Sequence, residues 1–306
     1  MLDLCFLLNG RSALQGGLHF RALPLGVADP SAIPLLSTWH ALVLGLVVGL
    51  TEFLPISSSA HLAVVPVWLG WKDPGLALSA VIELGSSGAV IAYFRHDLLR
   101  IGRALLQAWR RGDWTAPDAK LGIAIALGTL PLLLVGVVVK LWAPDLAHGV
   151  LRSFQVIGVV SILMAALLGL AEWIGSRRRS LPEVTLADGA LAGLAQALAV
   201  IPGVSRSGST ITTSLLVGLR REDAARFSFL LGIPAVALAG LSEIGDAIQA
   251  SGSTGIVPLL VGIATAAISS WFTIGVLLGY LKRHSTWIFV GYRLVFGIVL
   301  LSHRWG

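Results

Sequence analysis

Charge and cysteine are both scarce in this sequence. Of its 306 residues, 12% are Asp, Glu, Lys or Arg and 56% are hydrophobic, and the mean hydropathy is +0.85. A composition this apolar exceeds what the core of a soluble domain requires and is typical of a chain that crosses a membrane several times. The single cysteine, Cys5, excludes a disulfide framework and a cysteine-based metal site.

Acidic residues are also fewer than basic ones, 16 against 22, which leaves a formal charge of +6. Fourteen of the 22 Lys and Arg residues lie in four alternate loops: 95–120, 175–186, 220–226 and 282–286. The intervening loops hold only two: 62–75, 143–153 and 244–255. Cytoplasmic loops of membrane proteins are enriched in Lys and Arg. The distribution therefore predicts a membrane protein with both chain termini outside, and it removes the need for a nucleic-acid partner.

Long apolar runs predict the membrane-spanning helices, at about 76–94, 121–142, 154–174, 226–243, 256–281 and 287–303. The basic stretch 95–114 that follows the first of these is expected to form an interfacial helix. Residues 1–35 contain three prolines and are predicted to be an irregular N-terminal extension, whereas residues 36–303 are predicted to form a single membrane domain.

Two further apolar segments are interrupted by polar residues. An apolar helix that starts at Trp39 stops at Pro55, in the run EFLPISSSAHL, and the segment 187–219 contains the run PGVSRSGST at residues 202–210. An unsatisfied backbone group costs several kcal/mol in hydrocarbon, so a broken helix at that depth survives only inside protein or beside a wet cavity. Each segment is therefore predicted to be a re-entrant helix hairpin.

The two hairpins belong to an internal repeat. A shift of 147 residues places Pro55 on Pro202 and Ser58 on Ser205. Each half, about 38–174 and about 187–303, then contains one hairpin and three spans, and the first spans of the two halves run in opposite directions. We therefore predict an all-α polytopic membrane fold of about ten helices, built as an inverted-topology repeat. The hairpins enter from opposite faces, so their polar tips meet near the midplane.

Such a meeting brings together polar side chains from both hairpins: Glu52, Ser57, Ser58, His61, Ser205, Arg206, Ser207 and Thr210. A guanidinium presents a planar fork of donors suited to phosphate. The hydroxyls and the freed backbone amides near Gly203, at the start of a half-helix, would add an anion cradle. This constellation predicts a phosphate-bearing ligand. The alternative is that Arg206 only satisfies Glu52 and the carbonyls of the broken helix.

Most of these side chains have more than one role open to them. Glu52 could position a metal ion, act as a general base or pair with Arg206. His61 could transfer a proton, contact phosphate or serve in packing. Ser58 and Ser205 are each a candidate nucleophile or a helix cap.

Two charged residues lie within the predicted spans. Glu83 lies about two turns into the span 76–94 and either reaches the cavity or serves in packing. Arg293, in the last span, is expected to extend its guanidinium toward the membrane surface or to pair locally.

Three runs in this sequence resemble a known family: EFLPISSSAH (52–61), PGVSRSGST (202–210) and FSFLLGIP (227–234). They are similar to the undecaprenyl-diphosphate phosphatases of the bacitracin-resistance type, and the resemblance covers about residues 38–303. It implies a hydrolase of the bacterial inner membrane that cleaves a phosphoanhydride and returns undecaprenyl phosphate to peptidoglycan synthesis. It also implies bacitracin resistance, an active site that faces the periplasm, Mg²⁺ or Ca²⁺ as a helper and, in many members, a homodimer.

The resemblance assigns roles by position. Glu52 matches the second acid of the family's E/Q-x-x-x-E motif, Ser58 a proposed nucleophile and His61 its associated histidine. Arg206 matches the phosphate-binding arginine, and Ser57, Ser205, Ser207 and Thr210 are the accompanying hydroxyls. The chain departs from the motif at its first acid, because Val48 stands there. We hypothesise that Glu83 replaces the lost carboxylate as a metal ligand.

Two functions of other classes remain open at this point. Inverted repeats with broken helices are also the architecture of secondary transporters, so the chain could be a lipid-phosphate flippase or transporter. It could also be a non-catalytic phospholipid-binding scaffold. Phosphate release from a diphosphate lipid in detergent would favour the enzyme over both.

Overall fold

The computed structural model describes residues 37–71, 76–142 and 150–303. Its regular elements within these ranges are helices, listed here in chain order: α1 (Thr38–Thr51), α2 (Ser58–Trp68), α3 (Leu76–Tyr93), α4 (Arg95–Arg111), α5 (Pro117–Trp142), η3 (Val150–Arg152), α6 (Phe154–Ile174), η4 (Leu181–Glu183), α7 (Leu186–Ala197), η5 (Leu198–Val200), α8 (Arg206–Leu216), α9 (Arg221–Thr254), α10 (Ile256–Leu281) and α11 (Trp287–Ser302). The predicted extension at residues 1–35 lies outside the described residues.

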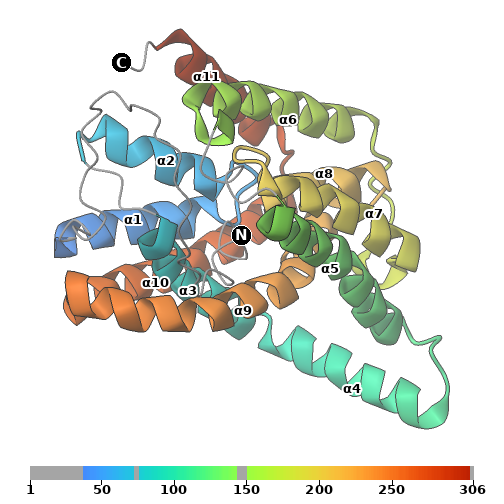
Figure 1. Ribbon diagram of the computed structural model, residues 1–306. Coiled ribbons are helices and arrows are strands. Elements are labelled where there is room, and N and C mark those ends of the chain that lie inside the picture. The colour runs from blue at the N-terminus through green and yellow to red at the C-terminus, as the bar shows by residue number, and fades with distance from the viewer. Residues whose placement is uncertain (1–36, 72–75, 143–149, 304–306) are drawn as a thin grey trace.

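The helices are those of a multi-pass membrane protein. Three of them, α5, α6 and α10, are long and apolar enough to cross a membrane by themselves. Four further helices, α1, α3, α7 and α11, are apolar but shorter. The predicted span 226–243 is part of α9, a continuous helix of 34 residues. The predicted interfacial helix is α4, which projects from the body of the molecule (Figure 1).

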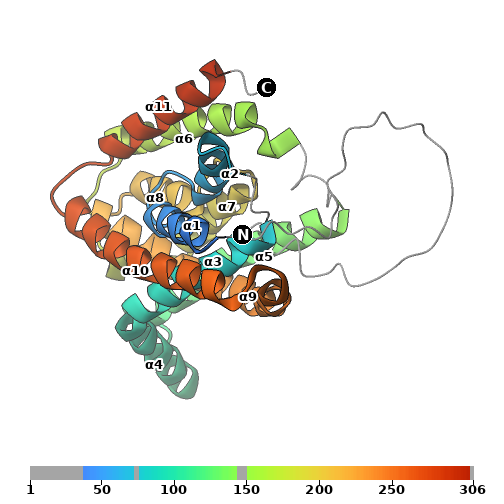
Figure 2. The same ribbon diagram turned by 90° about the vertical axis from the view of Figure 1, so that its left-hand side faces the viewer.

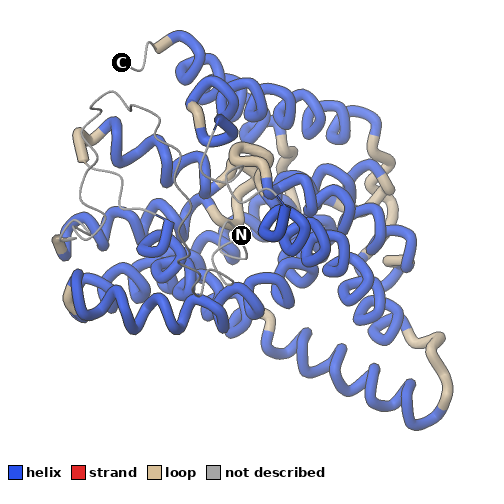
Figure 3. Tube along the Cα trace, viewed as in Figure 1, coloured by secondary structure: helices blue, strands red, loops and turns tan. Residues whose placement is uncertain are grey.

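Both predicted helix breaks are present, and they separate two pairs of short helices, α1–α2 and α7–α8, which we call the hairpins. In Figure 2 they occupy the middle of the molecule, with α6 and α11 on one side and α9 and α10 on the other. The loops that break each pair lie in the interior (Figure 3). Two interrupted segments therefore lie where the surrounding helices can cover their broken backbone.

The hairpins match each other in local geometry. The helices α2 and α8 have 11 residues each. Each is preceded by a serine with a positive φ, 76° at Ser57 and 69° at Ser205, and each is followed by a glycine with a positive φ, Gly70 and Gly218. The local register is therefore 148 residues, and the predicted pairing of Ser58 with Ser205 is wrong by one. Pro55 stands three residues before α2 but Pro202 stands four before α8, so aligning the prolines shifts the helices.

Helix packing repeats the same relationship. α1 packs on α10 of the other half, and α7 packs on α5, whereas α6 pairs with α11 and α3 with α9. The contact of α1 with α10 and the contact of α7 with α5 both depend on glycine. A Cβ on Gly45 would lie 2.5 Å from Gly262 O, and one on Gly193 would lie 2.4 Å from Gly128 O. These close approaches fix the position of the first helix of each hairpin.

A buried carboxylate joins three elements away from the hairpin tips. Glu172, at the end of α6, is 2% exposed. It accepts hydrogen bonds from Arg221 Nε at 2.9 Å and from Thr286 Oγ1 at 2.8 Å. Arg221 begins α9 and Thr286 precedes α11. Because a buried charge is tolerated only when paired and hydrogen-bonded, this contact ties α6 to the second half of the molecule.

Candidate active site

The two hairpins meet through Ser207. Its hydroxyl lies 3.0 Å from Leu54 O and 3.2 Å from Glu52 O, as a donor from the first turn of α8 to the loop after α1. These two carbonyls follow the end of α1, beyond the last turn of the helix, and Leu54 O also accepts from Ile56 N at 2.7 Å. The prediction that the polar tips come together is thus confirmed, and a hydroxyl of one hairpin satisfies the broken backbone of the other.

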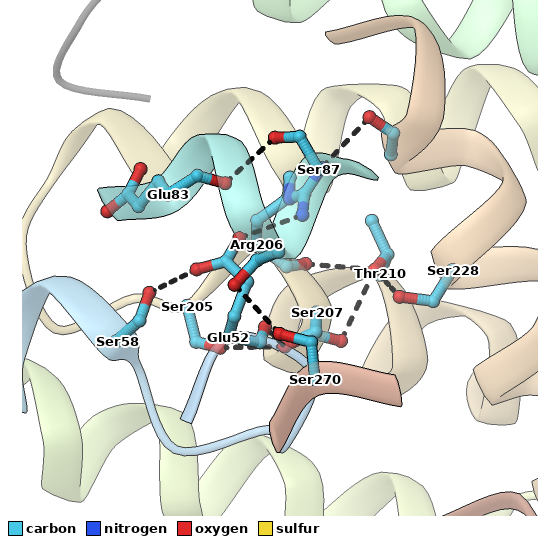
Figure 4. Close-up of polar contacts among 12 residues, drawn as sticks. Glu52, Ser58, Glu83, Ser87, Ser205, Arg206, Ser207, Thr210, Ser228 and Ser270 are labelled. Carbon is cyan, nitrogen blue, oxygen red and sulfur yellow. Dashed lines mark hydrogen bonds and ion pairs between the residues drawn. The ribbon is translucent and has the colours of Figure 1, made fainter. Parts of the chain in front are cut away.

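Glu52 bridges the two hairpins at the centre of this meeting (Figure 4). Its Oε1 pairs with Arg206 Nη2 at 3.0 Å, and its Oε2 accepts from Ser58 Oγ at 2.5 Å. Ser58 and Arg206 are the first residues of α2 and α8, so they are equivalent in the 148-residue register. The same position thus supplies a hydroxyl in one hairpin and a guanidinium in the other, and one carboxylate contacts both.

The guanidinium of Arg206 is also hydrogen-bonded to α9. Its Nη1 donates to Gly232 O at 2.9 Å. A Cβ at residue 232 would lie 2.4 Å from Nη1 and 2.9 Å from Cζ, so any larger residue would displace the guanidinium from this position. Arginine has five N–H donors, of which Gly232 and Glu52 engage two. Within the described residues, no hydrogen bond engages the other three.

A cleft lies in front of this group. It has a volume of about 60 Å³ and is lined by residues from both hairpins, α3 and η3: Glu52, Ser57, Ser58, Ser59, Leu62, Ser79, Ala80, Glu83, Arg152, Ala199, Val200, Pro202, Ser205 and Arg206. A space of about 10–15 Å³ already holds one water molecule, so this cleft admits a polar group of several atoms. Of the predicted site residues, six line it: Glu52, Ser57, Ser58, Glu83, Ser205 and Arg206.

Three other predicted phosphate ligands, Thr210, Ser207 and Gly203, do not line the cleft but contact residues that do or the turns beside it. Thr210 is fully buried, and its hydroxyl donates to Arg206 O at 2.8 Å and lies 2.5 Å from Ser228 Oγ. Ser207 joins the hairpins, and Gly203 provides a turn carbonyl and a φ of 95°. None of the three is among the cleft-lining residues in the described part of the chain. The sequence placed them near the site because they neighbour Arg206, but α8 directs the hydroxyls of Ser207 and Thr210 into the protein, and Gly203 has no side chain.

His61 also lies outside the cleft. Its Nδ1 lies 2.7 Å from Ser57 O and its Nε2 lies 2.6 Å from the hydroxyl of Tyr292 on α11. The ring stacks on Phe296 with centroids 4.6 Å apart. Both nitrogens therefore face protein partners, and the histidine fixes the turn residue Ser57 in its positive-φ conformation. Of the roles open to His61, this geometry favours packing and positioning.

Two arginines occupy places at the site that the sequence did not indicate. Arg152, in η3, lines the cleft together with Arg206. Its isolation as the one cation of the loop 143–153 was the available signal. Arg293 is 1% exposed and donates to carbonyls of both hairpin turns. Of its two expected placements, the membrane surface is wrong, because the side chain is buried, and local pairing is wrong in that its acceptors are carbonyls far away in sequence. The turns offer carbonyls with no helical partner.

The fit of a divalent cation depends on Glu52 and Glu83, the two carboxylates that line the cleft. Val48 is 0% exposed within an apolar cluster of α1, α2, α3 and α10, so the E/Q-x-x-x-E pair is absent. The described residues contain no group of three His, Cys, Asp or Glu side chains that could hold a metal ion. One or two carboxylates with substrate phosphate oxygens are, however, the usual ligands of Mg²⁺. The donor set therefore fits a cation that enters with a phosphorylated ligand.

Comparison with known proteins agrees with this geometry. The model of the family "Bacitracin resistance protein BacA" matches residues 41–299. A Synechococcus protein (strain RCC307) named undecaprenyl-diphosphatase is 60% identical over 264 residues, 86% of this chain and 92% of its own length. A protein of the same name from Parasynechococcus marenigrum (strain WH8102) is 56% identical over 279 residues, 90% of this chain and 97% of its own. One from Prochlorococcus marinus (strain MIT 9303) is 57% identical over 268 residues, 88% of this chain and 92% of its own. The chain therefore belongs to the BacA family of bacitracin resistance proteins.

Proposed function

We propose that this protein is an undecaprenyl-diphosphatase, which hydrolyses undecaprenyl diphosphate to undecaprenyl phosphate and phosphate and thereby confers bacitracin resistance. The observation that carries the proposal is the contact of one carboxylate with a hydroxyl and a guanidinium, Ser58–Glu52–Arg206, in a cleft between two buried helix breaks. The names of the relatives, each aligned over more than four fifths of this chain, support the same activity.

The terminal phosphate is bound by Arg206. Three of its N–H donors remain after Gly232 and Glu52 are satisfied, and Arg152 adds a second positive charge to the cleft wall. Fixed donors aimed at the charge that develops in the transition state are the strongest catalytic contribution of such a site. Ser205 and Ser57, which line the cleft at the starts of α8 and α2, provide further hydroxyls.

Glu52 acts as the general base, since its Oε2 already accepts the Ser58 proton. As that proton moves to Glu52, Ser58 Oγ bonds to the terminal phosphorus, and the bond from this phosphorus to the bridging oxygen breaks. Undecaprenyl phosphate leaves with the electron pair and takes up the proton. Glu52 then deprotonates a water molecule that attacks the phosphoserine, which releases phosphate and returns the proton to Ser58. In the alternative, Glu52 activates water for direct attack, and Ser58 only orients the carboxylate.

A divalent cation, if it binds with the substrate, would be held by Glu52 and Glu83 from the cleft wall. It would neutralise charge on the diphosphate. The protein residues described above supply the proton transfer and the phosphate binding.

We further propose that the two halves are inverted in the bacterial inner membrane and that the cleft opens to the periplasm. Arg152 and Ser79 line the cleft, and the first belongs to the cation-poor loop 143–153 that the charge distribution places outside. The homodimer implied by the resemblance stays a prediction, which size-exclusion chromatography with light scattering would test.

Phosphate release from a polyprenyl diphosphate in detergent tests the proposed activity, because detergent leaves no second compartment for a transporter to use. Purified protein should release phosphate, and Arg206→Lys should abolish most of the release. If the wild-type protein releases none with or without Mg²⁺ or Ca²⁺, the enzyme proposal fails. Lipid translocation by a vesicle-reconstituted Glu52→Gln variant would then favour the flippase.

A further inference from the structure

We propose that Arg293 is a positioning residue that sets the two hairpin turns against each other and thereby holds Glu52, Ser58 and Arg206 in register. The proposal rests on the proposed phosphatase activity and adds to it a residue from α11, far from either hairpin in sequence. Arg293 is not among the residues that line the cleft in the described part of the chain, so it acts through others and does not touch substrate.

The guanidinium of Arg293 lies between the two turns. Its Nη1 donates to Pro55 O of the first turn at 2.9 Å, and its Nη2 donates to Gly203 O of the second turn at 2.5 Å. The same Nη2 lies 3.4 Å from Val204 O, and Nε donates to Ser161 O of α6 at 3.3 Å. One side chain therefore connects both turns to each other and to the helix that supports them.

The carbonyls contacted by Arg293 stand next to the reacting groups in sequence. Pro55 lies midway between Glu52 and Ser58, and Gly203 and Val204 come directly before Ser205 and Arg206. A movement of either turn would therefore change the distance between Glu52 and Arg206, now 3.0 Å. The side chain also lies under the first turn of α8, because a Cβ on Gly208 would be 3.3 Å from Arg293 Nη1.

An arginine is required at this position because of its shape. The fork of a guanidinium presents donors in several fixed directions, whereas an ammonium is a single compact point of charge. The guanidinium is buried, with 1% exposure, and a buried charge is costly unless it is fully hydrogen-bonded. The turns of both hairpins meet that need, and their own carbonyls lack helical donors. If the guanidinium is removed, the turn carbonyls lose their donor, and if a turn moves away, the buried guanidinium loses an acceptor.

Ser207 makes a second connection between the hairpins, because its hydroxyl donates to Leu54 O and Glu52 O. The two turns are thus joined at two points. Arg293 donates to Pro55 O, and Ser207 donates to Leu54 O and Glu52 O. If both ties maintain one geometry, removing both should affect catalysis differently from the product of the separate effects.

The test compares Arg293→Met and Arg293→Lys with the wild type in kcat and KM for phosphate release from a polyprenyl diphosphate, per folded enzyme. A misplacement of about 1 Å costs about 100-fold in rate, so Arg293→Met should lower kcat by about 100-fold. Arg293→Lys, which keeps the charge but loses the fork, should lower kcat by about tenfold. KM should change by less than about threefold, because Arg206 and the cleft hydroxyls remain.

Arg221→Met is the matched control, because it also removes an arginine that satisfies a buried group, Glu172, but away from the cleft. It should lower Tm and leave kcat per folded enzyme within about threefold. In a double-mutant cycle, the fold-loss in kcat of the Arg293→Met, Ser207→Ala double variant should differ by more than about threefold from the product of the two single losses.

The proposal is overturned if both Arg293 variants keep kcat within about threefold of wild type per folded enzyme, whatever their Tm. If Arg293→Met does not fold, Arg293→Lys alone decides by the same criterion. An inactive wild-type protein would refute the phosphatase assignment instead, so the two failures are distinguishable in one assay.

Discussion

Gly232 gives the sharpest test of how Arg206 is held. In Gly232→Ala the new Cβ would lie 2.4 Å from Arg206 Nη1 and 2.9 Å from Cζ. A carbon–nitrogen contact needs roughly 3.4 Å or more, so the guanidinium must move by about 1 Å. That movement removes the hydrogen bond to Gly232 O, now 2.9 Å, and changes the pairing with Glu52.

A shift of this size costs about 100-fold in rate, which corresponds to about 2.7 kcal/mol of transition-state stabilisation. The change should not destabilise the fold in proportion. Gly232 lies inside α9, where alanine is favoured over glycine by about 0.5–1 kcal/mol, and the clash is with the end of a flexible side chain. Activity should therefore fall while Tm stays constant or rises.

The assay is phosphate release per folded enzyme, with a thermal melt of the same sample. Gly279→Ala, in α10, is the control, because a Cβ there meets no atom within 4 Å. It should keep wild-type activity. A Gly232→Ala enzyme with kcat/KM within about threefold of wild type would refute the conclusion that Gly232 positions the guanidinium.

Three further predictions concern the cleft itself. Arg206→Lys should lower kcat by at least about 100-fold, because the ammonium loses the fork that contacts both Glu52 and phosphate; steady-state phosphate release measures this, and near wild-type turnover would sink the assignment. Ser58→Ala should lower kcat by about 1000-fold and abolish a phosphoserine trapped from ³²P-labelled substrate, whereas direct attack by water predicts a loss below about tenfold and no label in either protein. Glu83→Gln should raise the concentration of Mg²⁺ or Ca²⁺ needed for half-maximal rate by about tenfold; full metal-dependent turnover in this variant would show that Glu83 does not replace the missing acid.

The sequence was sufficient to predict the helical membrane fold and the meeting of the hairpins. Backbone breaks at Pro55 and Pro202 stand out in apolar surroundings because hydrocarbon offers no substitute hydrogen bonds. The polar residues beside them then had to face one another. The prediction of contact among Glu52, Ser58 and Arg206 follows from that one physical constraint, and the structure places all three in one cleft.

The orientation of individual side chains could not be predicted from the sequence. Thr210 and Ser207 are close to Arg206 along the chain, but α8 begins at Arg206, and its helical rotation turns both hydroxyls into the protein. His61 was matched to a histidine that accompanies Ser58 in the family, with a packing role left open, and one turn of α2 directs it to Tyr292 on α11. Arg293 was misjudged because its partners are carbonyls of segments far away in sequence, which no periodicity or motif reports.

The relation between the hairpins explains why the site is asymmetric although its two supports are alike. Each hairpin brings a positive-φ serine and the first residue of a short helix to the junction. Symmetric residues there could present only one chemical character, whereas phosphate cleavage needs both an anion-binding group and a base. The chain has Ser58 and Arg206 at equivalent positions, and Glu52, whose counterpart at the 148-residue register is Val200, contacts both. The two hairpins thus provide a frame that Arg293 and Ser207 connect, and two differences between them, Ser58 against Arg206 and Glu52 against Val200, provide the catalytic groups.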